Sequence, residues 1–225
     1  MSAPASGYPG TPRMLRGGLV RIDPRTRKQL DVVAFQYNPD TVTRTIQPRA
    51  IGGEPGDRLE VLRLTGPPHE SIKLDAELDA TDQLEQPTLS ANAPATEQGL
   101  LPALAVLERL VTPTARELTE VDSLFDQGTM EVAPMESPLT VLVWGVKRVV
   151  PVLVSSMSIT EEAFDPKLQP IRVKVSFEFK VLTTNDLPLA HIGASLYIAY
   201  RQGVEQLAGM VTGSDARPLG LEHLP

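Results

Sequence analysis

The side chains best suited to chemistry in this sequence are the carboxylates of residues 75–82. Asp75, Glu77 and Asp79 alternate with apolar residues, so a strand would place all three on one face, and Asp82 follows them. Glycoside hydrolases use two carboxylates held across a substrate groove. A row of acids is more typical of a solvated face, or of a strand edge charged against aggregation. A hydrolase that uses this acidic strand is therefore the weakest of three functional hypotheses.

The other reactive side chains form no pattern typical of catalysis or of metal binding. The chain has no cysteine, and its histidines, His69, His191 and His223, do not lie at ligand spacing from one another or from carboxylates. It contains no Gly-x-Ser-x-Gly elbow, no phosphate-binding loop and no dinucleotide fingerprint. The acidic strand also lacks the loop of oxygen donors that calcium needs. The sequence thus predicts no catalytic residue, no metal site and no cofactor.

The composition is that of an ordinary globular protein. Of 225 residues, 41% are hydrophobic and 22% are charged, enough chain for one large domain or two small ones. The net charge of −7 argues against a partner that is a nucleic acid, and aromatic residues (4%) are too few for a stacking platform. Trp144, the only tryptophan, is expected to anchor the core.

The sequence leads us to expect no targeting signal. No stretch is apolar over the roughly 18 residues of a membrane span, so we expect no direct membrane insertion. The first 18 residues lack the apolar core of a signal peptide. We expect synthesis and assembly in the cytoplasm.

The charges are distributed unevenly along the chain. Residues 1–50 hold eight Lys or Arg and three Asp or Glu, residues 51–138 hold five and seventeen, and residues 139–225 hold eight of each. One part of the molecule is therefore basic and another strongly acidic. This division fits self-association through opposite patches, or an acidic region that is simply solvated.

Alternating residues predict strands in the first third of the chain. Residues 19–22 and 31–37 flank an Asp-Pro turn and are typical of a hairpin, and residues 41–47 predict a third strand after an Asn-Pro pair. Residues 71–80 alternate over their whole length and predict a half-buried strand with an acidic outer face.

The apolar period changes to that of a helix over residues 96–111. Its apolar stripe would consist of Leu100, Leu104, Leu107 and Val111. Thr96 could cap this helix, but Pro102 fits better if the helix begins near residue 101, because the first turn tolerates proline. Residues 112–138 predict a long acidic loop.

The second half of the sequence is more regular. Residues 139–150 are apolar on both faces and predict a central strand that bends at Gly145. Residues 151–164 and 170–182 predict two more strands, the second with the strongest alternation in the chain. Residues 188–211 predict a helix with one apolar side.

These elements together predict an α+β domain. Strands gather at both ends of the chain, with one helix in mid-chain and another near the C-terminus. The sheet should be mostly antiparallel, because connections such as residues 163–170 are too short for a parallel crossover. We expect a flexible N-terminal arm over residues 1–17, one β-rich domain over residues 18–211 and a short tail over residues 212–225.

Four short motifs, taken in order, resemble the tube-like adaptor proteins of contractile injection systems. These systems are phage-tail-like particles in which a sheath drives an inner tube through a membrane. The family has an aromatic strand that ends in Asn-Pro, then a Trp-Gly pair, a Thr and a Phe a few residues apart, and Pro-x-Arg before an alternating strand. The matching residues are Phe35, Tyr37, Asn38 and Pro39; Trp144 and Gly145; Thr160 and Phe164; Pro170 and Arg172.

The resemblance spans about residues 19–210 and implies a fold and a function. The fold would be a mostly antiparallel β-sandwich or small barrel of the tail-tube type with a flanking helix. The protein would be a non-catalytic subunit of a homo-oligomeric ring, a hexamer, that joins the spike to the inner tube at the baseplate hub. Its partners would be the spike or hub protein, the inner tube protein and baseplate components.

The resemblance also implies where the protein works. It would be made in the bacterial cytoplasm and would belong to a particle that is cytosolic, membrane-associated or released. Many relatives carry a LysM module after the last helix. We expect that module to be missing here, because the tail after residue 211 is too short for it.

The segment FQYNPDTVTRT, residues 35–45, carries the hypothesis about assembly. Asn38-Pro39 would end one strand, because proline lacks the amide that a ladder needs and restricts the residue before it. Phe35 and Tyr37 would pack on the core side, and the threonines that follow would face a channel or a neighbouring subunit. The ring would then form through strand edges and opposite charges. The alternative is a monomeric β-rich module that binds a small ligand or a carbohydrate.

Overall fold

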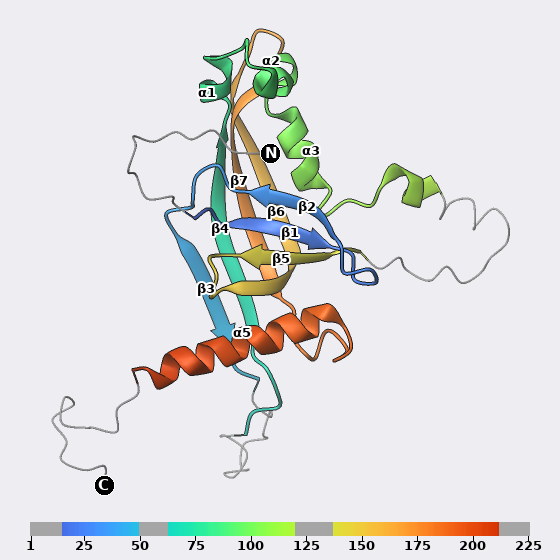
Figure 1. Ribbon diagram of the computed structural model, residues 1–225, viewed down its shortest axis with the longest axis vertical. Helices are drawn as coiled ribbons and strands as arrows, with labels where there is room; N and C mark the ends of the chain where they lie inside the picture. Colours follow the sequence, from blue (N-terminus) through green and yellow to red (C-terminus); the bar gives the residue numbers. More distant parts are fainter. Residues whose placement is uncertain (1–14, 50–62, 120–136, 212–225) are drawn as a thin grey trace, which may run out of the picture.

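The computed structural model describes residues 15–49, 63–119 and 137–211, and the strands of these parts form one antiparallel sheet. The strands are β1 Gly18–Ile22, β2 Gln29–Ala34, β3 Val42–Gln47, β4 His69–Asp79, β5 Leu139–Val143, β6 Val149–Phe164 and β7 Pro170–Val181. Their order in the sheet is β2-β1-β5-β6-β7-β4-β3 (Figure 1). The predicted α+β class and the mostly antiparallel sheet are confirmed.

The described helices are short, except for the last one. They are α1 Thr81–Leu84, the 3₁₀ helix η1 Ser90–Asn92, α2 Ala93–Gln98, α3 Leu101–Glu108 and α5 Ile192–Gly209, and residues 115–119 are also helical. Figure 1 shows α1 and α2 at one end of the long axis and α5 lying across the other end. None of the described helices is both long and apolar enough to cross a membrane.

The sheet bends strongly along β6. Residues 149–152 of β6 pair with β5, whereas residues 152–164 pair with β7, and the register shifts between Val154 and Ser156. A bulge of this kind bends a strand and increases its twist. In Figure 1, β1, β2 and β5 accordingly run across the long strands β4, β6 and β7. The core lies on the concave side, where both halves of the sheet contribute buried residues.

Strands β4 and β7 follow the predicted alternation closely. The apolar positions of β4, Ile72, Leu74 and Ala76, are buried, and their neighbours Lys73, Asp75 and Glu77 are exposed. On β7 the buried positions are Val173, Val175, Phe177, Phe179 and Val181. This confirms the half-buried strand with acidic residues on its outer face, because the period-two pattern matches one-sided burial.

The prediction of a single bent strand over residues 139–150 is wrong. The chain reverses at Gly145, which has a φ of +78°, and forms a hairpin between β5 and β6. The amide of Trp144 donates to the carbonyl of Arg148 at 2.8 Å and closes the turn. Both arms of the hairpin are apolar because β5 and the start of β6 lie inside the sheet, so no polar face marks the reversal.

The single helix predicted over residues 96–111 is broken into α2 and α3. Gly99 has a φ of +58°, and a Cβ there would lie 2.6 Å from the carbonyl oxygen of Pro170. The amide of Leu100 donates to that same oxygen at 2.9 Å, so the break fixes the helices to the start of β7. Thr96 lies inside α2 and is not an N-cap. Helix α3 begins at residue 101 with Pro102 in its first turn, which confirms the alternative prediction of a helix that starts near residue 101.

The last helix begins later than predicted, at residue 192 and not at 188. Its N-cap is His191, whose Nδ1 accepts a hydrogen bond from the amide of Gly193 at 3.0 Å.

The apolar stripe predicted for the mid-chain helix included Val111. This side chain is exposed, because α3 ends at Glu108. Residues 1–14, 212–225 and most of the predicted acidic loop lie outside the described residues.

Candidate functional site

The predicted signature residues fall into two groups in the structure. Phe35, Asn38 and Trp144 meet around Gly17, where the chain enters the sheet. Phe164, Pro170 and Arg172 lie at the far end of the β6–β7 hairpin, where Phe164 pairs with Pro170. Gly145 forms the β5–β6 turn, and Pro39 lies in the connection from β2 to β3. In the first group Phe35 and Gly17 are buried and Asn38 is exposed, whereas in the second group Phe164 and Arg172 are exposed and Pro170 is buried.

The first group, Gly17, Phe35, Asn38 and Trp144, is called the N-terminal cluster below. The Phe35 side chain is 2% exposed, and its ring lies 6.3 Å from Trp144 and 6.5 Å from Phe177. Such tilted contacts are a favoured geometry for aromatic rings. Trp144 is half-buried and packs against the core, which agrees with its predicted role as an anchor.

Asn38 connects this cluster to the residues that precede β1. Its Oδ1 accepts from the amide of Gly17 at 2.8 Å, and its Nδ2 donates to the carbonyl of Leu15 at 2.8 Å. The amide of Phe35 also donates to the carbonyl of Gly17 at 2.9 Å. Glycine suits residue 17, because a Cβ there would lie 2.6 Å from Cε3 of Trp144 and the indole or the chain would have to move. Residues 15–17, predicted as the end of a flexible arm, are therefore hydrogen-bonded to the domain.

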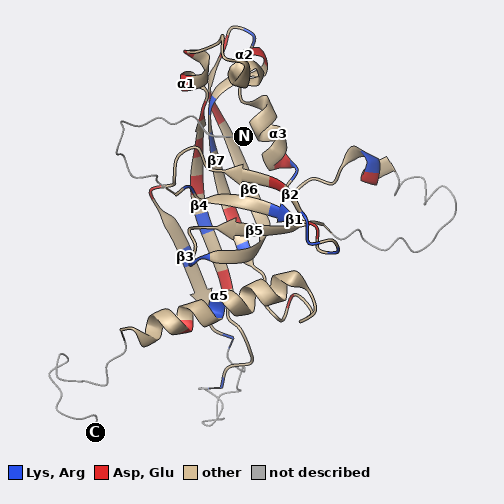
Figure 2. Ribbon diagram, in the orientation of Figure 1, with Lys and Arg blue, Asp and Glu red and all other residues tan. Residues whose placement is uncertain are grey.

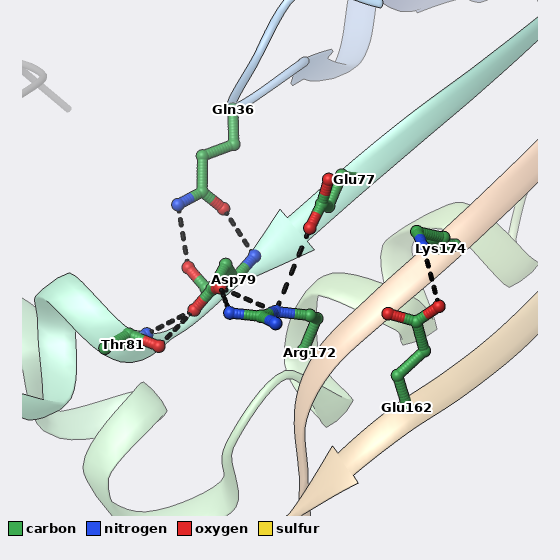
Figure 3. Close-up of polar contacts among 7 residues, drawn as sticks. All are labelled: Gln36, Glu77, Asp79, Thr81, Glu162, Arg172 and Lys174. Atoms are coloured by element: carbon green, nitrogen blue, oxygen red, sulfur yellow. Dashed lines mark hydrogen bonds and ion pairs between the residues drawn. The ribbon is translucent and has the colours of Figure 1, made fainter.

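The prediction that Tyr37 packs on the core side is wrong, since this side chain is 50% exposed. Strand β2 ends at Ala34, before the Asn-Pro pair, so residues 35–37 do not alternate between two faces. Sequence reasoning also missed Gln36 between them. Its amide group accepts from the Asp79 amide at 2.9 Å and donates to the Asp79 carbonyl at 2.7 Å, which caps the end of β4 (Figure 3).

Arg172, from the second group, belongs to a charged outer face on β4, β6 and β7. The residues of this charged face are Lys73, Asp75, Glu77 and Asp79 on β4, Glu162 on β6, and Arg172, Lys174 and Glu178 on β7. Arg172 contacts Asp79 at 2.8 Å and Glu77 at 3.8 Å, and Lys174 contacts Glu162 at 2.8 Å (Figure 3). Lys73 contacts Glu178 at 3.2 Å. In the predicted row of acids, Glu77 and Asp79 therefore lie opposite Lys174 and Arg172 on the next strand, whereas Asp75 lies opposite Ser176.

Asp79 is held as a carboxylate by its neighbours. Hydrogen bonds from the hydroxyl and the amide of Thr81, together with the guanidinium of Arg172, lower the pKa of Asp79, against the opposing effect of burial. A general acid of a glycosidase needs a raised pKa. The arrangement thus favours a structural role for Asp79. No group of histidines and carboxylates among the described residues is placed to hold a metal ion.

A buried ion pair fixes α5 to the sheet and was not predicted from the sequence. Glu70 on β4 is 4% exposed and accepts from Nε of Arg44 on β3 at 2.8 Å. Arg44 also donates to the hydroxyl of Tyr200 on α5 at 2.6 Å. Burial raises the pKa of Tyr200, and the nearby positive charges of Arg44, Arg148 and Arg201 oppose that shift. In the sequence, Arg44 is 26 positions from Glu70 and 156 positions from Tyr200, so no local pattern joins these three residues.

Three margins of the sheet lack a neighbouring strand within the described chain, and one of them is β2, which pairs only with β1. β3 pairs only with β4, and from residue 153 onward β6 pairs only with β7, so the layer β6-β7-β4-β3 has an open margin on each side. On β3, Thr43 and Thr45 are exposed, and the channel or subunit that they would face stays a prediction. The β6 margin carries Glu161 and Glu162, whereas Arg44 lies on β3, and Arg148, in the β5–β6 turn, is close enough to act on Tyr200, the partner of Arg44.

A cleft of about 810 Å³ lies between the segment after α3 and the start of β6. Its lining is largely apolar and includes Leu110, Leu139 and Val154. Its charged lining residues are Glu108, Arg109, Glu117 and Arg21. Arg21 is 8% exposed and already pairs with Asp31 at 2.9 Å. The cleft could hold an apolar group, but its buried cation is neutralised within the chain.

Comparison with models of known protein families and with curated proteins finds no match to this chain. The resemblance of its short motifs to the adaptors of contractile injection systems stays a prediction.

Proposed function

We propose that this protein is a non-catalytic structural subunit of a contractile injection system. In this proposal, six copies form a ring at the baseplate hub, and the ring connects the spike to the inner tube. The observation that carries the proposal is the pair of open strand margins on β3 and β6, which lie on opposite sides of one layer. A ring of identical subunits needs two different surfaces on opposite sides of each subunit, so that one surface binds the other on the next subunit.

The two margins complement each other in hydrogen bonding and in charge. Strand edges present unpaired amides and carbonyls, which another strand can bind. Glu161 on the β6 margin would meet the side of a neighbour that carries Arg148, because Glu162 and Arg44 already pair with Lys174 and Glu70 within the chain. Opposite charges of this type mainly set register and orientation. Pairing between unlike margins closes into a ring when the rotation between subunits allows it.

The positions of the signature residues also support a structural role. The N-terminal cluster ties the start of the chain to the core, and Arg172 neutralises the acids at the end of β4. These residues do not converge on a cleft. The charged face, with its side chains paired across strands, suits a surface that stays wet, such as the wall of a channel.

The test is the mass of the full-length protein combined with charge exchange across the two margins. We expect Glu161→Arg and Arg148→Glu each to weaken ring assembly by roughly tenfold or more, and the double variant to restore much of it, because each interface then regains an opposite pair. The matched control is Glu108→Arg, an equal change of charge at an exposed position of α3, which should leave assembly unaltered.

Rings would be counted by light scattering and by electron microscopy of the purified protein and of the native particle. A chain that is monomeric in both preparations would end the proposal.

The cleft next to β6 favours one other function, the monomeric binding module. That function would be supported by a monomer that retains a small apolar or carbohydrate ligand after purification.

A further inference from the structure

Strand β2 has an open margin that the proposed ring does not use. It pairs only with β1 and is the outermost of the three strands that cross the long ones (Figure 1). The amide of Phe35 donates to the carbonyl of Gly17 at 2.9 Å, which fixes the alternation of hydrogen-bonded pairs along the two strands. The amides and carbonyls of Val32 and Ala34 therefore point away from β1. They have no hydrogen-bond partner within the described chain, and both residues are exposed.

The β2 margin also differs in character from the other two open margins. β3 carries Arg44, and the free part of β6 carries Glu161 and Glu162. On β2, by contrast, the apolar side chains of Leu30 and Val32 are 48% and 54% exposed. Charged residues are a common means of keeping a strand edge from pairing with another strand. An open edge with apolar side chains is instead a template for an added strand.

Helix α3 lies beside β2 without covering this margin. Arg109, which follows the helix, contacts Asp31 at 3.5 Å, and Arg21 pairs with the same carboxylate at 2.9 Å. Asp31 is the only charged residue of β2, so its charge is neutralised within the chain. Val32, the next residue, is exposed. The margin thus presents backbone groups and apolar side chains, with no free acid.

The loop that precedes β2 is basic. Arg25, Arg27 and Lys28 are exposed, and none forms an ion pair with a described residue. Figure 2 shows Lys and Arg positions in this loop. Its one acid, Asp23, accepts hydrogen bonds at Oδ1 from the amides of Arg25 at 2.8 Å and Thr26 at 3.1 Å, so this carboxylate holds the turn. Three cations against one acid leave an excess of positive charge at the start of β2.

We infer that β2 binds an extended acidic segment of another polypeptide, which joins the sheet as an added strand. Backbone hydrogen bonds to Val32 and Ala34 supply affinity, and Leu30 and Val32 contact apolar residues at alternate positions of the segment. The sheet is antiparallel, so the segment runs opposite to β2 and its C-terminal end meets the basic loop. The partner's segment therefore has alternating apolar residues followed by acids. This binding is separate from ring assembly, which uses β3 and β6.

The test measures the binding of two synthetic peptides to the full-length protein by fluorescence anisotropy. The first alternates valine and threonine and ends in three glutamates, and the second has the same residues in reverse order. We expect the first to bind about tenfold more tightly at low salt, and its binding to weaken as salt screens the charges. In the complex, the amides of Val32 and Ala34 should exchange with solvent about tenfold more slowly or less, because they become hydrogen-bonded.

Two variants connect the binding to this margin. Arg25→Glu should weaken the binding of the first peptide about tenfold, because it reverses a charge of the basic loop. The matched control is Lys167→Glu in the β6–β7 turn, where Asp165 accepts from the amide of Lys167 at 2.7 Å as Asp23 does from that of Arg25. Val32→Pro removes an amide that β1 does not use, which an edge strand tolerates, and should weaken binding about tenfold or more. Arg25→Glu, an exposed substitution, decides the result if Val32→Pro does not fold.

The outcomes separate this inference from the proposed function. Wild-type protein that binds neither peptide, or both equally, would overturn the inference. An equal loss in Lys167→Glu would also overturn it, because the effect would then follow from net charge. Unchanged exchange at Val32 in the complex would do the same, because the peptide would then lie on another margin. Rings that bind no peptide would leave the proposed function intact, and a monomer that binds the first peptide would support the inference alone.

Discussion

The N-terminal cluster and the charged face contain signature residues of the same resemblance but depend on different physics. In the cluster, Phe35 is buried, Trp144 contacts it, and the hydrogen bonds of Asn38 join two segments of the chain. On the charged face, the side chain of Arg172 is 48% exposed, and its partners are the carboxylates of Glu77, 46% exposed, and Asp79, 14% exposed. A short sequence motif therefore does not reveal whether its residues determine the fold or the surface.

The magnitudes of the two kinds of interaction differ several-fold. Removing a buried aromatic side chain typically costs about 3–5 kcal/mol, because transfer free energy is lost and a cavity remains. An exposed ion pair contributes about 0–1 kcal/mol, because water and salt screen it. The cluster should therefore control whether the domain folds. Substitutions on the charged face should change stability little, and this face should act mainly through its contacts with a partner.

The largest effect is expected for Phe35→Ala. The substitution should lower the free energy of unfolding by about 3–5 kcal/mol, since the side chain is 2% exposed and packs on two aromatic rings. Phe164→Ala is the matched control, because Phe164 is also a signature phenylalanine but is 48% exposed. Urea unfolding followed by the fluorescence of Trp144 would measure both. Equal losses for the two variants would remove the distinction between the cluster and the surface.

The next effect is expected for Gly17→Ala. The new methyl group would lie 2.6 Å from Cε3 of Trp144, so the indole or the chain must move, at a cost of about 1–3 kcal/mol. Gly203→Ala in α5 is the control, because a Cβ there meets nothing within 4 Å and alanine favours helix. It should stabilise the protein by up to about 1 kcal/mol. A neutral Gly17→Ala would mean that residues 15–17 do not pack on the cluster.

Parts of the fold could be predicted because the sequence pattern maps directly onto burial. In β4 and β7 every second residue is apolar, so the exposed and buried faces follow from the alternation. The β5–β6 hairpin was missed because both arms are apolar and the turn at Gly145 lacks the Asn-Gly signal of a tight hairpin. The break between α2 and α3 depends on a contact of Gly99 with Pro170, which lies far away in the sequence.

The candidate site was predictable only at the level of residue types. Asn38 was singled out for ending a strand, but its main contacts are with Leu15 and Gly17, more than 20 positions earlier. Gln36 bonds to the backbone of Asp79, 43 positions away, and a lone glutamine between two aromatic residues carries no pattern that would indicate this. Partners brought together by the sheet alone leave no local signature.

The smallest of these effects concerns the charged face and depends on pH. Because Thr81 and Arg172 lower the pKa of Asp79 in the folded state, this carboxylate contributes stability at pH values above its unfolded pKa of about 4. That contribution is lost as the pH falls through the lower pKa of the folded state. Asp79→Asn should therefore reduce stability at neutral pH by about 1 kcal/mol or less, and the difference from wild type should shrink below about pH 4.

Thermal unfolding between neutral and acidic pH would measure this difference. The matched control is Asp75→Asn on the same strand, since Asp75 has no ion pair within the described chain, and its unfolding curve should run parallel to wild type. A loss for Asp79→Asn that is as large at acidic pH as at neutral pH would show that the hydrogen bonds to Thr81, and not the negative charge, stabilise the end of β4. The charged face would then resemble the N-terminal cluster in how it holds the chain, and Arg172 would be left free to act on a partner.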